Sequence, residues 1–466
     1  MATKRRPRPD LIVILIDDLR FDEFGAGGHP YMKTPNIDRI AAEGATFTRA
    51  FHPTPICSPN RASIVTGQYA SRHGIIDNVA RDAMSFRLPN YHLALQALGY
   101  ETAHVGKWHM GNSAAPRPGY DEWFSFPGHG SLIDPTFDHN GTTVHQTGYM
   151  TDLLNAHALE FVSRERDRPY ALFLAHKAVH PDAFQAADGT LDLAAFGGYR
   201  VPERHAELYR GEHFPPRPNV MTPEQAARGK PAWAESVTLK QQPGSKAVLE
   251  AIMSGSQEEI RLRAAMMASV DEGVGQLLDA LERSGRLDDT AILFMGDNGF
   301  FFGEHGLGPE RRFAYEEGIR SPFLLRYPRK VKAGTTIDRL VMSIDVAPTM
   351  VALAGGKPAK TIQGASLLPL LRDRKAPWRK SVLCEYYAEN AMPWLVGMSY
   401  KAVRTDRYKL IHWVNKAGQP GMLDELYDLR NDPYELDNLI RSKSHAQTVH
   451  RLRRELGRLV VGSLGL

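Results

Sequence analysis

The chain has 466 residues and carries 57 Lys and Arg against 53 Asp and Glu, a formal net charge of +4. So small a charge on so long a chain argues against a dedicated nucleic-acid binder, which concentrates its cations on one face. Hydrophobic residues make up 42% of the chain, a composition typical of a soluble globular protein with one large core and a smaller one.

No apolar run in the sequence approaches the roughly 20 residues that a membrane helix needs. The basic segment 1–8 is not followed by the apolar core of a secretory signal, because the apolar run 11–16 ends in Asp17. The cysteines Cys57 and Cys384 are too few for a disulfide framework and are expected to be free thiols. We therefore expect a cytoplasmic protein without a membrane or nucleic-acid partner.

Four apolar runs predict strands. Residues 11–16 and 291–295 lack the polar alternation of a half-exposed strand, so we expect buried strands of a parallel sheet. Residues 170–175 and 322–326 are weaker examples of the same pattern.

Helical patterns lie between these runs. Shorter amphipathic helices are expected over 36–43 and 91–98. A longer helix is expected from Met267 to Gly285, because apolar residues recur there at spacings of three and four: Val270, Val274, Leu277, Leu278 and Leu281. Strands that alternate with helices predict an α/β fold, with a large sheet covered by helices on both faces.

The pattern changes twice along the chain, which predicts two domains. We expect residues 1–374 to form the α/β domain. Within it, residues 181–255 are polar, aromatic and proline-bearing, and they indicate either an insertion near the rim of the active site or an irregular surface excursion. Residues 375–466 predict a small α+β subdomain, with strands over 381–386, 402–404 and 408–413 and a closing helix that has Leu452, Leu456, Leu459 and Val460 on one face.

Two polar pairs follow buried strands. Asp17 and Asp18 come directly after the first predicted strand. Asp297 and Asn298 follow the strand over 291–295. Since ligands of open α/β sheets bind beyond the carboxyl ends of the strands, we expect these side chains to meet. Converging carboxylates repel one another without a bound cation, and their oxygens suit Ca²⁺ or Mg²⁺ rather than zinc.

Cys57 lies in a polar stretch that predicts the start of a helix. Ser58 followed by Pro59 is a favourable cap and first turn, so Cys57 is expected just ahead of the helix. There the helix dipole favours an anion and lowers the pKa of a thiol. Arg61 follows Cys57 by four positions, whereas a thiolate phosphatase needs Cys-x₅-Arg, and the signature around a papain-like cysteine is also missing.

The order Cys57, Pro59 and Arg61, followed by Ala-Ser and Thr-Gly, resembles the signature of the type I sulfatases, members of the alkaline-phosphatase superfamily. Further segments similar to this family follow in the expected order between about residue 9 and about residue 440; they are 12–18, 34–38, 106–111, 296–299, 315–322 and 425–429. The resemblance implies an alkaline-phosphatase-like fold with a large mixed, mostly parallel sheet flanked by helices. It also implies an arylsulfatase-type enzyme that hydrolyses small-molecule sulfate monoesters.

The resemblance further implies a modified nucleophile and a metal. Cys57 would be oxidised to Cα-formylglycine (3-oxoalanine) by a formylglycine-generating machinery, and the hydrate of that residue would attack sulfur. One divalent cation, expected to be Ca²⁺ with Mg²⁺ or Mn²⁺ as alternatives, would be held by an oxygen of this residue together with Asp17, Asp18, Asp297 and Asn298.

By the same resemblance, Arg61 would hold the hydrate and His109 would accept the proton of its second hydroxyl. Alternation along a strand end places the side chains of Lys107 and His109 on one face. Lys107 would bind the sulfate together with His180 and Arg311. His180 would also donate a proton to the leaving oxygen.

Two departures from the family and three open points remain. The family usually shows Pro-His-x-Pro where this chain has Val179, His180 and Pro181. The family commonly has a lysine where this chain has Arg311, and Arg312 is expected to be a solvated neighbour. One alternative function is a phosphonate monoester or phosphodiester hydrolase of the same superfamily. Another is a non-catalytic Ca²⁺-binding protein in which Cys57 stays a thiol. The helix over 449–461 packs either on its own subdomain or on a second subunit, so a homo-oligomer is left open.

Overall fold

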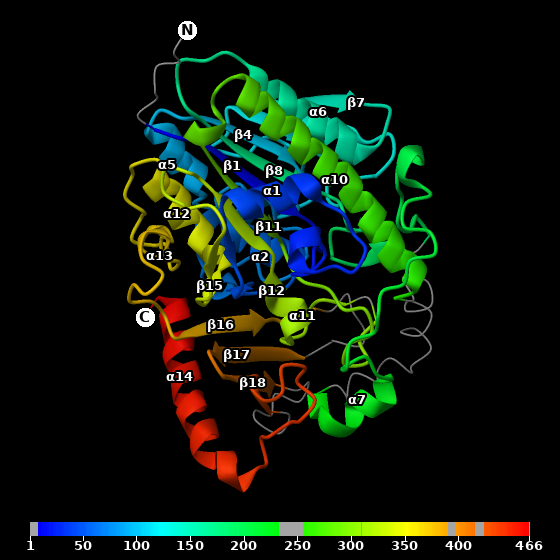
Figure 1. Ribbon diagram of the computed structural model, residues 1–466, viewed down its shortest axis with the longest axis vertical. Helices are drawn as coiled ribbons and strands as arrows, with labels where there is room; N and C mark the ends of the chain where they lie inside the picture. The colour runs from blue at the N-terminus through cyan, green and yellow to red at the C-terminus, as the bar shows by residue number, and fades with distance from the viewer. Residues whose placement is uncertain are drawn as a thin grey trace.

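The computed structural model describes residues 8–192, 194–232, 255–308, 310–389, 398–414 and 424–465. They form a large sheet with helices on both faces and, beneath it, a smaller antiparallel sheet flanked by the long helix α14 (Ala446–Leu464) (Figure 1). Across these residues, each helix is too short or too polar to cross a membrane.

Ten strands form the large sheet. In order across it they are β14 (Thr335–Ile337), β2 (Ala45–Phe47), β13 (Phe323–Arg326), β11 (Thr290–Gly296), β1 (Asp10–Ile16), β8 (Tyr170–His176), β4 (Glu101–Gly106), β5 (Glu122–Ser125), β6 (Thr136–His139) and β7 (Thr142–His145). β1 pairs in parallel with β11 and β8, and β4 pairs in parallel with β8 and β5. β13, β6 and β7 pair antiparallel, so the sheet is mixed, as expected.

The predicted strands over 11–16, 170–175 and 291–295 are confirmed as β1, β8 and β11. Alternate residues of β1 point into two cores, one on each face of the sheet, which is why the run is apolar throughout. The strand over 322–326 is confirmed as β13, but its expected parallel direction is wrong, because it pairs antiparallel with β11. The segment between these two strands contains no long crossover helix in its described part, and a parallel pairing needs such a crossover.

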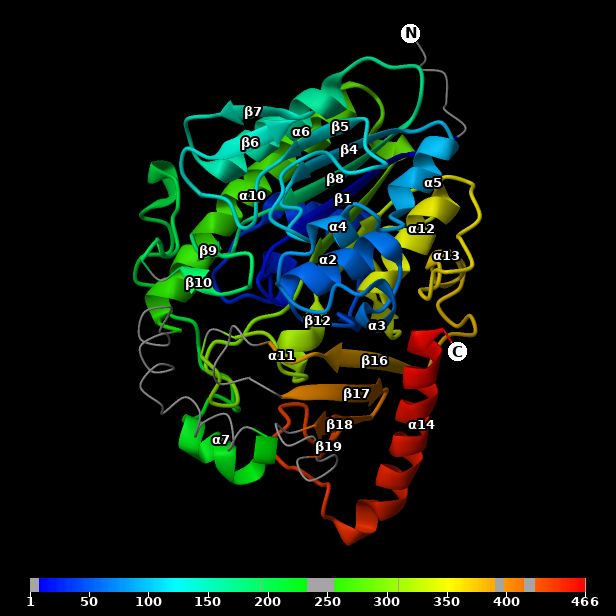
Figure 2. The same cartoon turned by 180° about the vertical axis from the view of Figure 1, so that it is seen from behind.

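Helices cover both faces of the sheet. α1 (Pro35–Glu43), α6 (Met150–Ser163) and α10 (Gln257–Arg283) pack on the face seen in Figure 1. α2 (Cys57–Thr66), α5 (Tyr91–Ala97) and α12 (Val346–Leu353) pack on the opposite face, seen in Figure 2. The helices expected over 36–43 and 91–98 are therefore confirmed as α1 and α5.

The long helix α10 starts well before its expected beginning at Met267. Ser256 caps the helix by accepting a hydrogen bond from the backbone N–H of Glu259. The buried Arg263 forms an ion pair with Glu23, and such a buried charge interrupts the apolar period that predicted the helix.

The part of the insertion over 181–255 that the structure describes lies at 181–192, 194–232 and 255; residues 193 and 233–254 lie outside the described residues. It contains the antiparallel pair β9 (Phe184–Gln185) and β10 (Leu191–Asp192), and α7 (Pro223–Gly229). Further described elements include β3 (Ala50–Phe51), β12 (Arg320–Ser321) and β15 (Val341–Met342), which pair in a small sheet, and the helices α3 (Ala70–His73), α4 (Asp82–Ser85), α11 (Glu316–Ile319) and α13 (Leu368–Arg372).

The antiparallel sheet near the C-terminus consists of β16 (Ser381–Tyr386), β17 (Ser399–Thr405), β18 (Tyr408–Val414) and β19 (Glu425–Asp428). It confirms the three predicted strands and adds β19. One face of the sheet packs on α14 through Leu383, Val403, Leu410, Val449, Leu452 and Leu456, and the other face packs on the large domain around Phe313 and Tyr315. The fold is therefore α/β with a smaller α+β unit, as predicted.

Leu452 is 2% exposed and joins α14 to its sheet. We expect Leu452→Ala to lower the free energy of unfolding by about 2–5 kcal/mol, because the substitution leaves a cavity. Val461 lies on the same helix and is 50% exposed, so Val461→Ala should change stability by less than about 0.5 kcal/mol. Denaturant unfolding of both variants checks this. Equal changes in the free energy of unfolding would mean that the packing of Leu452 on the sheet does not stabilise α14.

Candidate active site

Three neighbouring strands of the sheet, β11, β1 and β8, end side by side, and polar residues follow their carboxyl ends. In the register of the sheet, Ile16 lies opposite Gly296 on one side and His176 on the other. Asp17 and Asp297 are the next residues after these ends, and the backbone N–H of Asp297 donates to the carbonyl of Ile16. The carboxyl ends of the strands therefore meet where α/β sheets bind their ligands.

The two polar pairs form one buried cluster. The backbone N–H of Asp18 donates to Asp297 Oδ1 at 2.9 Å, and Asn298 Nδ2 donates to Asp18 Oδ1 at 2.7 Å. Cys57 Sγ lies 3.5 Å from Asp17 Oδ1. Ligand atoms of Asp17, Asp18 and Cys57 lie within 4.8 Å of one another. The structure thus brings together the residues that the sequence predicts as metal ligands.

This cluster fits a hard divalent cation. Asn298 Oδ1 is buried and has no hydrogen-bond partner, which leaves an oxygen available for a ligand. Burial raises the pKa of Asp297 to about 7, and the neighbouring Asp17 carboxylate contributes. Burial also raises the pKa of Asp18, against the charge of Arg311. Crowded, buried carboxylates of this kind are stabilised by a bound cation, and their oxygens suit Ca²⁺ or Mg²⁺.

Cys57 is the first residue of α2, and Ile56 occupies the cap position without a side-chain hydrogen bond. The expectation that Ser58 caps the helix is wrong, because its hydroxyl donates to the carbonyl of His109. The expected lowering of the thiol pKa is also wrong. Burial raises the pKa of Cys57 well above its ordinary value, and the Asp17 carboxylate adds to the effect, which outweighs the helix terminus.

Three cationic side chains enter the cluster. Arg61 Nε donates to Asp297 Oδ2 at 2.9 Å, while its Nη2 is buried without a hydrogen-bond partner. Lys107 Nζ donates to Asp17 Oδ2, and Arg311 Nη1 donates to Asp18 Oδ2. Although burial alone raises the pKa of Asp17, Lys107 and nearby cations hold it well below its usual range.

Three histidine rings lie side by side at the cluster. The ring centroid of His129 lies 4.0 Å from that of His109 and 4.6 Å from that of His180. Burial lowers the pKa of all three rings, and the charge of Lys107 contributes to each lowering. His180 Nδ1 lies 2.8 Å from the carbonyl oxygen of Pro181, which leaves Nε2 directed toward Asp18, at 3.9 Å from its Oδ2.

Two predictions for this region differ from the structure. β4 ends at Gly106, so Lys107 and His109 do not alternate along a strand. His109 instead has a left-handed backbone with φ of 57°, and its ring lies beside that of His129. Arg312 is not a solvated neighbour: it is buried and forms ion pairs with Glu310 and Glu389. A run of two arginines does not reveal which one has buried acidic partners.

Three further buried or half-buried residues lie at the site and were not predicted from the sequence. His129 Nδ1 lies 3.2 Å from Lys107 Nζ, and its Nε2 lies 3.0 Å from Gln185 Oε1. Gln185 belongs to β9, so the insertion reaches the site. Lys177 is buried, its Nζ has no hydrogen-bond partner, and burial together with Lys107 lowers its pKa to about 7. In the sequence, the signal for His129 was the glycine on either side of it, Gly128 and Gly130. Both have left-handed backbone in the structure, a conformation that glycine adopts readily.

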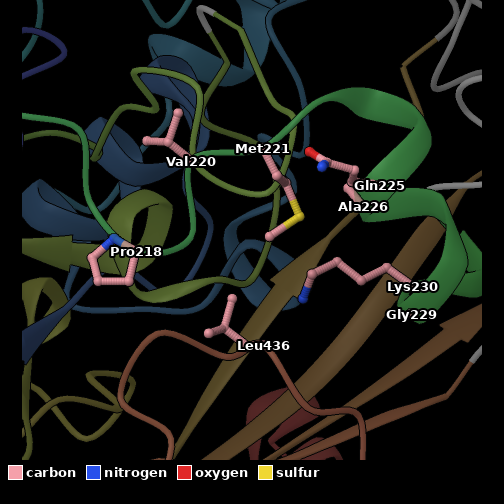
Figure 3. Close-up of a pocket in the computed structure, with 8 residues that line it drawn as sticks. All are labelled: Pro218, Val220, Met221, Gln225, Ala226, Gly229, Lys230 and Leu436. Carbon is pink, nitrogen blue, oxygen red and sulfur yellow. The ribbon is translucent and has the colours of Figure 1, made fainter.

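A separate hollow of about 380 Å³ lies beside α7 (Figure 3). Met221 and Lys230 point toward it from the insertion, and Leu436 lies opposite them. Lys230 Nζ donates to the hydroxyl of Tyr427 at 2.7 Å and to the carbonyl of Glu435 at 2.8 Å. Its ammonium group therefore already has hydrogen-bond partners within the protein. The residues that line this hollow include no carboxylate and no histidine, unlike the cluster around Cys57.

Comparison with known proteins places the chain in a family. Residues 9–356 match the model of the sulfatase family, and residues 303–461 match the C-terminal region of N-sulphoglucosamine sulphohydrolase. The chain is 29% identical to an N-acetylglucosamine-6-O-sulfatase of Bacteroides thetaiotaomicron, over 94% of this chain and 84% of that protein. It is 26% identical to an arylsulfatase of Clostridium perfringens, over 96% of this chain and 94% of that protein.

Solved structures show the same relationship. A protein in complex with its substrate D-glucosamine-2-N,6-O-disulfate superposes with a TM-score of 0.80 at 28% identity, over 97% of each chain. A phosphonate monoester hydrolase of Agrobacterium radiobacter superposes with a TM-score of 0.77 at 22% identity, over 98% of this chain and 96% of that chain, and shares the fold alone. Because the family match spans residues 9–356, the protein belongs to the sulfatases, the sulfuric ester hydrolases.

Proposed function

We propose that this sulfatase hydrolyses sulfate monoesters with a nucleophile derived from Cys57, releasing inorganic sulfate and an alcohol or phenol. The observation that carries the proposal is the position of Cys57, whose Sγ lies 3.5 Å from Asp17 Oδ1 within the cluster of buried carboxylates. Arg61, on the same helix, reaches Asp297 in that cluster. A group at position 57 therefore lies between acidic ligands and cations, as a nucleophile for a tetrahedral anion requires.

The proposed nucleophile is the hydrate of formylglycine at position 57. Such a hydrate supplies two hydroxyls on one carbon: one attacks sulfur, and loss of the proton from the other expels sulfate and restores the aldehyde. The buried Nη2 of Arg61, which lacks a hydrogen-bond partner, supports a role for Arg61 in binding the hydrate. His109 Nδ1 lies 3.4 Å from the hydroxyl of Ser58, next to Cys57, which supports His109 as the acceptor of the second proton.

Asp17, Asp18, Asp297 and Asn298 would hold one Ca²⁺ ion, with Mg²⁺ or Mn²⁺ as alternatives. A divalent cation supplies, when bound, the positive charge that makes the attacking hydroxyl more acidic. The support for Ca²⁺ is the ligand set, which consists of carboxylate and amide oxygens, together with the unpartnered Oδ1 of Asn298.

Lys107, His180 and Arg311 would bind the sulfate group. Lys107 and Arg311 would balance the negative charge that develops on the sulfuryl group as the ester bond breaks. His180 would act on the leaving oxygen through Nε2, because its Nδ1–H is donated to the carbonyl of Pro181 at 2.8 Å. Nε2 can donate a proton only when the ring carries both protons, a form that the bound sulfate anion would favour. The contact of Lys107 and Arg311 with the ligand carboxylates supports their place beside the reacting atoms.

We further propose that the sulfate ester is carried by an amino sugar. An N-acetylglucosamine-6-O-sulfatase matches over 94% of this chain, and a protein whose structure was solved in complex with a disulfated glucosamine matches over 97% of it. Both support a glucosamine 6-O-sulfate as the substrate class.

The nucleophile can be tested by mass spectrometry. Formylglycine would lower the mass of the peptide containing Cys57 by about 18 Da, since oxygen replaces sulfur and two hydrogens. We expect this mass in protein from a host with the modification machinery, and we expect Cys57→Ala to abolish hydrolysis. Cys384, a buried residue of β16, serves as the control, because Cys384→Ala should keep activity. Active protein with an unmodified Cys57 would refute the proposed nucleophile, whereas inactive, unmodified protein would favour the Ca²⁺-binding alternative.

Lys107→Ala should reduce kcat by about 10²–10³, the usual cost of removing one preorganised group that stabilises transition-state charge. The fold should survive, which circular dichroism checks. The exposed Lys332 provides a matched control, and Lys332→Ala should leave kcat unchanged. A Lys107 variant within a few-fold of the parent would remove this residue from the mechanism.

The substrate class can be tested by comparing kcat/KM on four esters: N-acetylglucosamine 6-O-sulfate, an aryl sulfate, an aryl phosphonate monoester and a phosphodiester. We expect the sulfated sugar to be hydrolysed with the highest value and both sulfates to exceed both phosphorus esters. A higher value for the phosphonate would favour the phosphonate hydrolase alternative. A preference for the aryl sulfate would retain the sulfatase and overturn the amino-sugar proposal.

A further inference from the structure

A second group of potential metal ligands lies at another edge of the large sheet, outside the cluster around Cys57. Glu122 comes from β5, His139 from β6 and His157 from α6, which lie next to one another in Figure 2. His139 Nε2 lies 3.0 Å from Glu122 Oε1, and His157 Nε2 lies 2.9 Å from the same oxygen. One ligand atom from each residue falls within 4.8 Å of the other two.

The fold holds these three side chains together. Glu122 and Phe124 are two residues apart on β5 and therefore point to the same face of the sheet, where α6 packs. The ring of His157 stacks on Phe124 at 4.1 Å with an angle of 9° between the planes. His139 lies opposite Phe124 in the register of β5 and β6 and meets the same ring at its edge, with centroids 5.7 Å apart. Both imidazoles are therefore fixed with Nε2 toward the carboxylate.

We propose that Glu122, His139 and His157 bind a zinc ion. Bonds of about 2.0–2.2 Å in a tetrahedral site separate the ligand atoms by about 3.4 Å. The separations of 2.9 and 3.0 Å between each imidazole Nε2 and Glu122 Oε1 are shorter than this, so these ligand atoms would move apart to admit the ion. Each neutral imidazole would bind through Nε2 with its proton on Nδ1, so that ligation replaces two hydrogen bonds to Glu122 without loss of a proton.

The surroundings of the three side chains and the types of their ligand atoms also favour zinc. Glu122 Oε2 accepts a hydrogen bond from Arg164 Nη1 at 3.0 Å, which leaves Oε1 for the metal. Two imidazole nitrogens and one carboxylate are a borderline ligand set that prefers zinc to Ca²⁺, in contrast to the oxygen ligands around Cys57. The side chain of His139 is 39% exposed, so an ion can enter from solvent and keep a water as its fourth ligand. The bound ion would tie the β5–β6 ribbon to α6.

The test uses the full-length protein in excess Ca²⁺, so that the oxygen-rich cluster is filled before Zn²⁺ or Co²⁺ is added. We expect one Zn²⁺ to bind, the midpoint of thermal unfolding to rise, and Co²⁺ to give the visible absorption of a tetrahedral site. His139→Ala removes a ligand and should weaken Zn²⁺ binding by more than the roughly 10–100-fold that loss of an outer-shell partner costs.

Two further variants make the outcome decisive. His145 is an exposed histidine on the neighbouring strand β7, and His145→Ala should leave Zn²⁺ binding unchanged. Glu122→Gln keeps the shape of the side chain but removes its charge, and it should also weaken binding if the protein stays folded. Absence of Zn²⁺ binding, an octahedral Co²⁺ spectrum, or equal affinity in the parent and His139→Ala would overturn the proposal.

Discussion

The structure around Cys57 depends on the electrostatic balance of buried carboxylates. Asp17, Asp18 and Asp297 are fully enclosed at the ends of two adjacent parallel strands, where their charges repel one another. The register of β1 and β11 fixes their separation, so the sheet cannot relax the repulsion by moving them apart. Arg61, Lys107 and Arg311 supply opposing charge, and the divalent cation that we propose would complete the balance.

The cationic side chains that contact these carboxylates come from distant parts of the chain. Arg61 lies on α2, whereas Lys107 follows β4, which is separated from β1 by β8 in the sheet. The insertion also takes part, because Gln185 on β9 holds His129 and His129 in turn contacts Lys107. A segment with weak periodicity in the sequence is thus joined to the ends of the central strands by hydrogen bonds between side chains.

The central strands and the polar residues that follow them could be predicted from the sequence, because strands buried on both faces are apolar throughout and the polar groups stand at their ends. The direction of β13 could not, since an apolar run does not encode which way its partner runs. The environment of Arg312 and the raised pKa of the Cys57 thiol depend on burial among groups far away in sequence. His129 was missed for the same reason: its partners Lys107 and Gln185 become neighbours only in the folded chain.

The segment that carries Arg311 is clasped by the C-terminal sheet. The hydroxyl of Tyr400 on β17 donates to the carbonyl of Arg312 at 2.9 Å, and the hydroxyl of Tyr315 donates to Glu425 on β19 at 2.9 Å. The smaller unit therefore helps to position Arg311 at the candidate active site. If Arg311 binds the sulfate as proposed, exchanges in the smaller unit would change how the ester is held without altering position 57.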